Sequence, residues 1–470
     1  MPAPSPSPST AAIILAAGQG SRMRSTRAKV LHPVGGQPMV RHLLATLDEL
    51  DVTTRVLVVG AGRAQVESAL AEDGLVFALQ DPPQGTGHAV MAAMPSLDKT
   101  FDDILVLYGD TPLLTGGTLA ALLDARRRQA ADGRAHAAAV VGFRPADPAG
   151  YGRLIADASG ALLRIVEDKD ATEDERRVTL CNSGVMAFDG RLLPDLLAQL
   201  GNDNAKGEYY LTDTVAVARA MDRQTAIVEA PADEVLGVNT RADLAAAEAA
   251  FQARMRCAAM ANGATLTAPE TVFFSHDTQL GRDVTVGPQV VFGPGVMVED
   301  DVRIEAFSHL EGCHIASGAV IGPYARLRPG AEIGVGARVG NFVEIKKSVL
   351  GEGAKANHLS YIGDAQVGAG TNIGAGVITC NYDGSAKHVT EIGAGVFVGS
   401  NAALVAPVKI GDGALVGAGS TISRNVPADA VAVTRAEQTT LPGAAARRRT
   451  RLSGAQTKQS ASTPTDKSLE

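Results

Sequence analysis

The first residues suited to chemistry lie near the start of the chain and could bind phosphate. Gly18 and Gly20 follow an apolar run and precede Arg22 and Lys29. Glycines at the end of a strand let backbone N–H groups approach a phosphate chain, and the two cations would neutralise its charge. Two glycines after a strand also form an ordinary tight turn, so the prediction of a phosphate site depends on Arg22 and Lys29.

A second candidate is the carboxylate of Asp110, which closes the apolar run ILVLYGD. Mg²⁺ prefers oxygen ligands and usually takes only one or two of them from the protein, so a single aspartate can suffice. The alternative is a solvated carboxylate that caps a loop, which is a common role of aspartate after glycine. Both interpretations place Asp110 where a strand ends.

The C-terminal half carries residue types suited to acyl transfer. His358 lies close in sequence to Tyr361, and a histidine can take the proton of an attacking amine. Arg328 and Lys346 are eighteen residues apart, and we expect them to stack and hold one phosphate. A structural histidine and two solvated cations are the alternative. The basic run at 447–451 either contacts phosphate groups of a ligand or belongs to a solvated tail, and we favour the tail.

Composition limits the classes to which the chain can belong. Its 470 residues suggest about two to three domains. The 43 basic and 51 acidic side chains give a net charge of −8, which disfavours broad binding to nucleic acid or to an anionic membrane. The four cysteines show neither a disulfide framework nor zinc-ligand spacing. The first ten residues resemble no secretory signal, and no apolar run is long enough to cross a bilayer, so we expect a cytoplasmic protein.

Up to about residue 238, short apolar runs alternate with amphipathic stretches. The runs AAIILAAG, RVLVVGAG, ILVLYGD and AAAVVGF are predicted to be buried strands, and 39–50 and 118–128 are predicted to be helices. Strands that alternate with helices form a mainly parallel, doubly wound (Rossmann-like) α/β sheet. Ligands of such sheets bind beyond the carboxyl ends of the strands, where Gly18 and Asp110 both lie.

The second half of the chain has a six-residue period. An aliphatic or Phe side chain returns at Leu280, Val286, Phe292, Val298, Ile304, Leu310, Ile315, Ile321, Leu327, Ile333, Val339, Ile345, Ile392, Val398, Leu404, Ile410, Val416 and Ile422. This period is typical of a left-handed parallel β-helix of hexapeptide repeats, with three short strands per coil and the aliphatic side chains inside. The period slips to five residues after 310 and after 345, and it fails between 373 and 392. We therefore expect the loop 379–390 to project outward.

Several segments resemble one family of enzymes. LAAGQGSRM and KVLHPVGGQPM resemble the opening of the sugar-phosphate nucleotidyltransferases, and QDPPQGTGHAV, YGD, GYGR, IVEDKDA, CNSGVMAF, NAKGEYYLTD and GVNTRADL follow in that family's order. With the hexapeptide repeats, residues 13–435 resemble the bacterial bifunctional N-acetylglucosamine-1-phosphate uridylyltransferases / glucosamine-1-phosphate N-acetyltransferases. The resemblance implies acetyl transfer from acetyl-CoA to glucosamine 1-phosphate, then uridylyl transfer from UTP with release of pyrophosphate. The product would be UDP-N-acetylglucosamine, a precursor of peptidoglycan and lipopolysaccharide.

The resemblance also implies a nucleotide site with Mg²⁺. Arg22 and Lys29 would act on the phosphates, while Asp110 and Asn239 would be the metal ligands. The residues implied to bind nucleotide or sugar are Leu15, Ala16, Ala17, Gly18, Lys29, Gln80, Gly85, Thr86, Tyr108, Gly109, Asp110, Gly152, Glu167, Asn182 and Asn239. Among these, uracil would be recognised by Gln80, Gly85 and Thr86, and the amino sugar by Gly152, Glu167 and Asn182. Gln19 stands where relatives often have Lys, which removes one phosphate contact.

For acetyl transfer, the resemblance implies that His358 is the base that activates the amine of glucosamine. Around the sugar phosphate it implies Arg328, Lys346, Tyr361, Asn372 and Lys387, and around acetyl-CoA it implies Ala375, Asn381, Tyr382, Ser400, Ala418 and Arg435. Attack on the thioester creates an oxyanion that needs an N–H donor. Cys380 has no visible base with an orienting partner, so we expect direct transfer rather than an acyl-cysteine.

The sequence predicts five segments: a disordered extension at 1–10, a uridylyltransferase domain at 11–240, a linker helix at 241–263, a β-helix acetyltransferase domain at 264–442 and a disordered tail at 443–470. Thr240 and Asp243 predict the start of the linker helix. The implied partners are UTP, acetyl-CoA, glucosamine 1-phosphate, N-acetylglucosamine 1-phosphate and, in a homotrimer, copies of the chain, with neither nucleic acid nor membrane.

Two alternatives stay open at this point. One is a nucleotidyltransferase of another sugar, in which the β-helix only assembles or regulates the enzyme. The other is a non-catalytic scaffold, because solenoids often serve as binding surfaces. His358, Tyr361 and the Asn381–Tyr382 pair disfavour the first alternative, and the presence of Lys29 and Asp110 disfavours the second.

Overall fold

The computed structural model describes residues 8–71, 73–130, 132–157, 160–204 and 206–460, with side chains in the last helix up to residue 454. The chain forms two compact units that divide between Val335 and Gly336. The sequence instead predicts a domain boundary at residues 263 and 264. The difference arises because the first turns of the β-helix pack against the α/β part of the chain, as described below.

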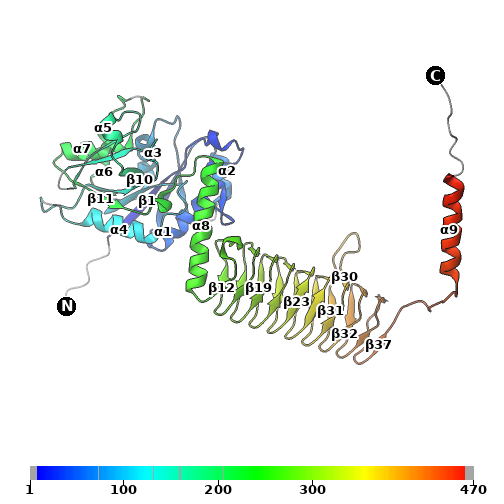
Figure 1. Ribbon diagram of the computed structural model, residues 1–470. Helices are drawn as coiled ribbons and strands as arrows, with labels where there is room; N and C mark the ends of the chain where they lie inside the picture. Colours follow the sequence, from blue (N-terminus) through cyan, green and yellow to red (C-terminus); the bar gives the residue numbers. More distant parts are fainter. Residues whose placement is uncertain (1–7, 72, 131, 158–159, 205, 461–470) are drawn as a thin grey trace, which may run out of the picture. The chain divides into compact units, whose positions relative to one another are not determined.

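The first unit contains a nine-stranded sheet in the order β11-β7-β10-β6-β1-β4-β5, with the hairpin β8–β9 beside β10. Figure 1 labels β1, β10 and β11 of this sheet. The strands are β1 (Thr10–Leu15), β4 (Thr54–Val59), β5 (Val76–Leu79), β6 (Asp103–Tyr108), β7 (Ala138–Phe143), β8 (Arg153–Ala156), β9 (Leu162–Val166), β10 (Cys181–Asp189) and β11 (Thr225–Glu229). β1 runs parallel to β4 and β6, whereas β10 runs antiparallel to β6 and β7. The predicted mainly parallel α/β sheet is confirmed.

Helices cover both faces of this sheet because its strands are apolar on both sides. The helices and short elements are α1 (Met39–Asp48), α2 (Arg63–Ala69), α3 (Thr86–Ala93), α4 (Gly116–Arg127), α5 (Glu173–Arg176), α6 (Leu193–Ala198), α7 (Thr214–Ala220), the 3₁₀ helices η1 (Ser21–Met23), η2 (Lys29–Leu31), η3 (Met94–Ser96), η4 (Leu211–Asp213) and η5 (Ala232–Val235), and the hairpin β2 (Pro33–Val34) and β3 (Gln37–Pro38). In β1, Ala12 and Ile14 pack toward α1, α2 and α4, while Ala11 and Ile13 pack toward α3, α6 and α7.

The long helix α8 (Arg241–Ala261) begins at the predicted capping box of Thr240 and Asp243. It contacts the turn of the β2–β3 hairpin, where Glu248 Oε2 accepts a hydrogen bond of 2.8 Å from Gly35 N. The carbonyl of Gly35 in turn accepts 2.8 Å from the backbone N–H of His276, which belongs to the first turns of the β-helix. These bonds join hairpin, helix and β-helix start within one unit.

The β-helix strands of the first unit lie in three parallel sheets. They are β12 (Thr265–Leu266), β13 (Gln279–Leu280), β14 (Thr285–Val286), β15 (Val291–Phe292), β16 (Met297–Val298), β17 (Arg303–Ile304), β18 (His309–Leu310), β19 (Cys313–Ile315), β20 (Val320–Ile321), β21 (Arg326–Leu327) and β22 (Ala331–Ile333), with η6 (Pro269–Thr271) before them. The predicted inward positions from Val286 to Ile333 are all buried, which confirms the six-residue pattern. The five-residue slip after Leu310 shortens a coil, so that His309 pairs with Arg326, 17 residues on.

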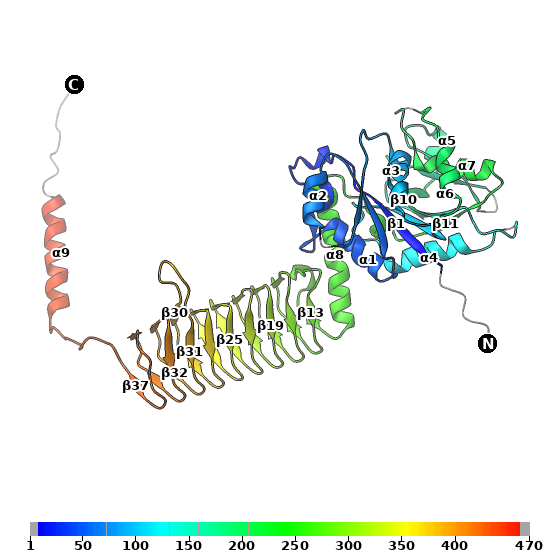
Figure 2. The same ribbon diagram turned by 180° about the vertical axis from the view of Figure 1, so that it is seen from behind.

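The second unit continues the pattern with β23 (Arg338–Asn341), β24 (Glu344–Lys346), β25 (Ser348–Leu350), β26 (Lys355–His358), β27 (Tyr361–Gly363), β28 (Ala365–Val367), β29 (Asn372–Ile373), β30 (Ile378–Cys380), β31 (Thr390–Ile392), β32 (Phe397–Val398), β33 (Ala403–Val405), β34 (Val408–Ile410), β35 (Leu415–Val416), β36 (Thr421–Ile422) and β37 (Val431–Ala432). Its three sheets are β23-β26-β29-β32-β35-β37, β24-β27-β30-β33-β36 and β25-β28-β31-β34. Figure 2 shows these strands in a row of stacked coils.

The interruption of the repeat is an external loop between β30 and β31 (Figure 1). Thr379 and Thr390 themselves are buried strand residues, so the projecting loop is 381–389 rather than the predicted 379–390. Across the loop, Ile378 pairs with Ala403, 25 residues on, and the ladder then resumes. The coil keeps its register because the extra residues leave the stack.

Two stretches predicted to be disordered contain structure in their described parts. Ser9 donates from its backbone N–H to Asp102 Oδ2 at 2.9 Å, and Thr10 already belongs to β1. Near the C-terminus, helix α9 (Ala444–Ser460) occupies part of the predicted tail. Ala and Arg favour helix by local propensity, without any apolar stripe to bury. Residues 1–7 and 461–470 lie outside the described part of the chain.

No helix among the described residues is both long and apolar enough to cross a membrane.

Candidate active sites

A cleft of about 490 Å³ opens in the first unit where β1 and β6 end. Eleven residues of the predicted nucleotide site line it, namely Leu15, Ala16, Ala17, Gly18, Lys29, Gln80, Gly85, Thr86, Tyr108, Asp110 and Asn239. They come from six segments of the sequence. The parallel strands bring them together because the carboxyl ends of these strands share one edge of the sheet.

Three of these residues form a polar cluster at the floor of the cleft. The Lys29 ammonium makes an ion pair with Asp110 and lies 3.2 Å from Asn239 Oδ1. The side chains of Lys29 and Asp110 are each only 14% exposed. The backbone holds the other two groups in place, since Val238 N donates to Asp110 O at 2.9 Å and Asn239 N donates to Asp243 Oδ2 at 3.0 Å. The capping box of α8 therefore also orients Asn239.

The two oxygens around Lys29 fit the requirements of a magnesium ion. They already hold one cationic group, and carboxylate and amide oxygens are the ligand types that Mg²⁺ prefers. Across the described residues there is no group of three or more His, Cys, Asp or Glu side chains that could hold a metal. Asp110 and Asn239 would thus supply two ligands and leave the rest to water and phosphate, which is the usual arrangement for Mg²⁺.

The residues implied to recognise uracil lie at the start of α3. Gly85 has φ of +104° and precedes the helix, and a Cβ there would come within 2.6 Å of Tyr209 O. Gln80 is buried and donates from Nε2 to Gly85 O at 2.9 Å. Thr86 Oγ1 accepts a bond of 3.0 Å from Leu211 N. Only glycine fits at position 85, and the bond from Gln80 fixes this turn.

The residues implied to bind the amino sugar form a neighbouring group that does not line the same cleft. Asn182 N donates to Gly152 O at 2.8 Å, so these two residues are in contact. Glu167 accepts a bond of 3.4 Å from Thr212 Oγ1, and burial raises the pKa of its carboxyl. Burial and the charge of Glu167 also raise the pKa of the Tyr108 phenol.

Two residues predicted for the nucleotide site do not line the cleft. Arg22 lies in η1 with an exposed side chain and is not part of the cleft lining, and buried Gly109 packs against Val30. Several lining residues were missed by sequence reasoning, namely Pro83, Thr111, Tyr151, Ser183, Glu208, Val235 and Gly237. Most of them stand inside or beside the motifs quoted above, such as GYGR and GVNT. These motifs were the signal available in the sequence, because a single residue of one of these types does not by itself indicate a binding site.

In the second unit, several implied acetyl-transfer residues follow one corner of the β-helix, here called the first corner. It consists of the turns after β23, β26, β29, β32, β35 and β37. His358 begins the series, and its carbonyl accepts 3.2 Å from Gly376 N beside Ala375. On later coils, Gly419 N, beside Ala418, donates to Ser400 O at 2.8 Å. The stem of Arg435 lies next to Gly419.

His358 has an orienting partner that sequence reasoning missed. Asn341 ends the neighbouring strand β23, and its Oδ1 lies 2.7 Å from His358 Nδ1. When Nδ1–H donates to this oxygen, the lone pair of Nε2 remains available to accept a proton. The register of β23 and β26 places the two residues directly side by side, which a single sequence does not reveal.

The remaining acetyl-transfer residues gather at a different corner, here called the second corner, formed by the turns after β24, β27, β30 and β33. Lys346 O accepts 3.1 Å from Asp364 N. Asn381 Nδ2 donates to the Asp364 carboxylate and lies 3.5 Å from the hydroxyl of Tyr361, which starts β27. Tyr382 is 60% exposed and pairs with Lys387 across the projecting loop.

Three further residues complete the set. Asn372 begins β29 and pairs with Lys355. Arg328 follows β21 in the first unit, so its expected stacking on Lys346 stays a prediction. Cys380 is half-buried and, like the other three cysteines, free. Its thiol lies 4.0 Å from Ile378 O.

Comparison with protein families matches two parts of the chain. Residues 12–180 match the model described as MobA-like NTP transferase domain, and residues 390–424 match the model described as bacterial transferase hexapeptide (six repeats). These ranges fall in the α/β sheet and in the later coils of the β-helix. A solved structure of a putative glucose-1-phosphate thymidylyltransferase from Bacillus anthracis aligns with 51% of this chain and 94% of its own at 20% identity and a TM-score of 0.41, a likeness too weak to support a conclusion.

Curated relatives match nearly the whole chain. The bifunctional protein GlmU of Maricaulis maris is 63% identical over 93% of this chain and 95% of its own length. Those of Rhizorhabdus wittichii and Rhodospirillum rubrum are 60% and 58% identical over 93% and 94% of this chain, and 96% and 98% of their own lengths. Because these bifunctional relatives match both halves of the chain, the alternative of a non-catalytic scaffold is excluded. The chain belongs to the bacterial family of bifunctional N-acetylglucosamine-1-phosphate uridylyltransferases / glucosamine-1-phosphate N-acetyltransferases.

Proposed function

We propose that the two reactions of this enzyme take place at two separate sites of the chain. Uridylyl transfer is assigned to the cleft around Lys29, Asp110 and Asn239, and acetyl transfer to the surroundings of His358. The observation that carries the first assignment is the half-buried cluster of one cation and two oxygen ligands at the carboxyl edge of the sheet. The observation that carries the second is the contact between His358 Nδ1 and Asn341 Oδ1.

In uridylyl transfer, an oxygen of the sugar 1-phosphate attacks the α-phosphorus of UTP, and pyrophosphate leaves. A phosphate monoester is mostly dianionic at neutral pH, with a second pKa of about 6, so no protein base is needed. Lys29 would neutralise charge on the phosphates, Gln80 and Thr86 would hold the uracil, and Glu167 with Asn182 would orient the sugar. Mg²⁺, held by Asp110 and Asn239, would supply further charge neutralisation on the phosphates.

In acetyl transfer, the amine of glucosamine 1-phosphate attacks the carbonyl carbon of the acetyl thioester. His358 Nε2 would take the proton of the amine, while Asn341 holds the ring through Nδ1. The new C–N bond creates a tetrahedral oxyanion, whose collapse breaks the C–S bond, and CoA leaves as a thiol with the proton that His358 has taken up. Lys346, Tyr361 and Lys387 would hold the sugar phosphate.

The acetyl site would be shared between copies of the chain in a homotrimer. Ala375, Ser400 and Ala418 follow the first corner with His358, whereas Asn381 and Tyr382 lie at the second corner. Residues on the two corners of one β-helix can form a single site most simply when the first corner of one copy contacts the second corner of another. The first corner also carries exposed apolar side chains, Phe342 at 56% and Leu359 at 62%, and such residues favour burial against a second copy.

The cytoplasm is the proposed location, because all four cysteines are free and both substrates that carry the transferred groups, UTP and acetyl-CoA, are intracellular metabolites.

Two substitutions test the assignment of the sites. Asp110→Ala should abolish formation of UDP-N-acetylglucosamine while release of free thiol from acetyl-CoA stays near normal. His358→Ala should abolish thiol release but, when supplied with N-acetylglucosamine 1-phosphate, should still form UDP-N-acetylglucosamine at a near-normal rate. Pyrophosphate and thiol are followed separately in the purified protein, with circular dichroism as the control for folding. Loss of both activities in either folded variant would overturn the two-site model.

A further inference from the structure

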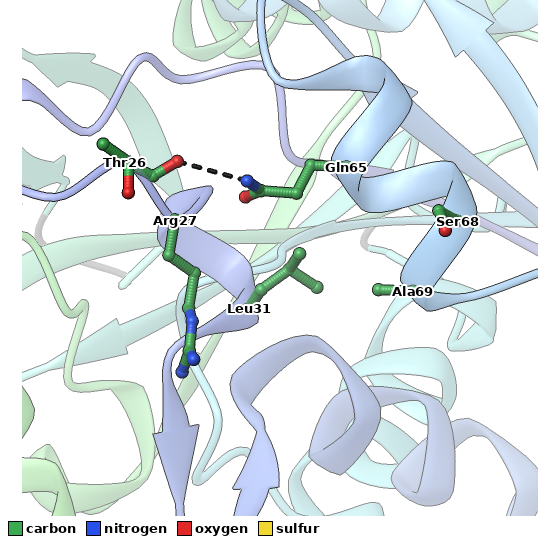
Figure 3. Close-up of a pocket in the computed structure, with 6 residues that line it drawn as sticks. All are labelled: Thr26, Arg27, Leu31, Gln65, Ser68 and Ala69. Carbon is green, nitrogen blue, oxygen red and sulfur yellow. Dashed lines mark hydrogen bonds between the residues drawn. The ribbon is translucent and has the colours of Figure 1, made fainter.

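The loop that leads to Lys29 is tied to helix α2 by one side chain. Gln65 lies on α2 and uses both ends of its amide, because Oε1 accepts from Ala28 N and Nε2 donates to Thr26 O at 3.2 Å. Figure 3 shows the amide reaching from α2 across to Thr26, with Ser68 and Ala69 on the same helix. One side chain therefore holds two backbone positions on either side of Arg27.

These two positions directly precede the element that carries Lys29. Residues 24–28 connect η1 and η2 without regular secondary structure, and Arg24 among them has φ of +46°. Ala28 is the N-cap of η2, and its carbonyl accepts 3.0 Å from Leu31 N. Because Lys29 is the first residue of η2, the position of Ala28 sets where the Lys29 side chain starts.

The base of this clamp is packed into the core. Val66, which follows Gln65, and Leu70, one helical turn further on, are fully buried in the core that packs against the sheet. A Cβ on Gly62, the N-cap of α2, would come 3.3 Å from the Ala28 Cβ, so helix and loop are also in direct contact. The amide of Gln65 thus connects a fixed helix to an otherwise irregular loop.

Gln65 also lines two grooves. One groove, of about 410 Å³, is lined by Thr26, Arg27 and Leu31 together with Gln65 (Figure 3). The other groove, of about 460 Å³, shares Thr26, Arg27 and Gln65 with the first and includes Gly18 and Lys29. The side chain itself does not line the nucleotide cleft, so it acts on that cleft only through the loop.

From this geometry we infer that Gln65 is a positioning residue for uridylyl transfer, which holds Thr26 and Ala28 so that the Lys29 ammonium reaches the phosphates of UTP beside Asp110 and Asn239. The inference rests on the proposed role of Lys29. Gln65 touches no substrate in this assignment. Its amide is needed because only a group with both a donor and an acceptor can satisfy a carbonyl and an N–H at once.

The test uses the full chain with Gln65→Met, which keeps the length of the side chain and removes both hydrogen bonds. Loss of two neutral hydrogen bonds should lower kcat/KM for UTP about tenfold. Acetyl transfer should not change, because it takes place in the other unit. Ser68→Ala, one turn along α2 and in the wall of the same groove, is the matched control and should leave both activities unchanged.

A double-mutant comparison separates positioning from a merely structural role. In a Lys29→Ala background, Gln65→Met should cost nothing further, because the group that it positions is gone. An equal tenfold loss in both backgrounds would overturn the inference, as would a Gln65→Met protein with full activity. Should Lys29→Ala alone leave uridylyl transfer intact, the proposed role of Lys29 itself would fall, and this outcome is distinct from the other two.

A second variant guards against a folding defect in Gln65→Met. Gln65→Glu keeps the acceptor for Ala28 N but places a carboxylate oxygen, another acceptor, against the carbonyl of Thr26. We therefore expect a loss of kcat/KM for UTP similar to that of Gln65→Met. The midpoint of thermal unfolding of each variant should match that of Ser68→Ala. A Gln65→Glu protein with full activity and unchanged stability would contradict the need for the bond to Thr26.

Discussion

Lys29 and Asp110 form an ion pair in the half-buried floor of the nucleotide cleft, although 81 residues separate them in the sequence. Two groups that the sequence assigns to different tasks, phosphate binding and metal binding, thus share one location. A cation of the protein and a metal ion would act on the same phosphates of UTP.

Metal removal should affect one reaction only. Asp110 and Asn239 offer oxygen ligands in the cleft, whereas the proton transfer proposed for His358 needs no metal. EDTA should therefore stop pyrophosphate release and spare thiol release from acetyl-CoA. Added Mg²⁺ should restore the first reaction, and circular dichroism shows whether the fold is intact. Acetyl transfer that depends on metal in a folded protein would contradict this prediction.

Mixed trimers should recover acetyl transfer when the defects lie on different corners. His358→Ala and Asn381→Ala are each expected to be inactive, but subunit exchange between them creates some sites with both corners intact. The measurement is thiol release after exchange, with sedimentation to establish a trimer. As a matched control, His358→Ala mixed with Arg435→Ala should stay inactive because both residues lie on the first corner. A monomeric mass, or failure to complement despite proven exchange, would mean that one chain builds the whole site.

Protonation of His42 should weaken the first unit in mild acid. Burial lowers the pKa of its imidazole below the ordinary value of 6.5, and Nε2 donates to Val34 O at 2.8 Å. The unfolded chain binds this proton more readily than the folded one, so the free energy of unfolding should fall as the pH drops through about 6.5. The midpoint of thermal unfolding, measured from about pH 7.5 to 5.5, should fall less steeply in His42→Gln than in the unsubstituted protein.

The control for this prediction is His136→Gln, which removes a histidine from another part of the same unit. An unchanged pH dependence in His42→Gln would show that His42 does not contribute. The prediction concerns stability and not activity, because His42 packs against Phe251, at 5.5 Å between ring centroids, rather than in the nucleotide cleft.

Gly35→Ala should destabilise the contact between the β2–β3 hairpin and α8. Gly35 has φ of +54°, and a Cβ there would come 2.3 Å from the ring of Phe251. Overpacking should cost about 1–3 kcal/mol and the left-handed backbone about 1 kcal/mol more. Gly74→Ala isolates the second cost, because Gly74 has φ of +64° and open space around it. Equal drops in the midpoint of thermal unfolding for both variants would show that the Phe251 ring moves aside without a loss of stability.

The sequence by itself determined both architectures. The alternation of apolar runs with amphipathic stretches led to the α/β sheet, because such runs bury both faces of a parallel strand. The six-residue recurrence from Val286 onward led to the β-helix, and those positions are buried because each coil offers only an interior and an exterior. The capping box at Thr240 likewise placed the start of α8, since a cap is a local interaction.

Only the tertiary structure decided which residues meet. Gln65 and Thr26, or Asn341 and His358, come together through the packing of α2 and the register of β23 against β26, and no spacing in the sequence specifies either. The same holds for the division of the acetyl-transfer residues between two corners. The repeat determines how often a corner recurs, but a coil of 17 residues and an external loop shift the count, so the period does not tell which corner each residue occupies. Local patterns determine elements, whereas a site depends on contacts between segments far apart in the chain.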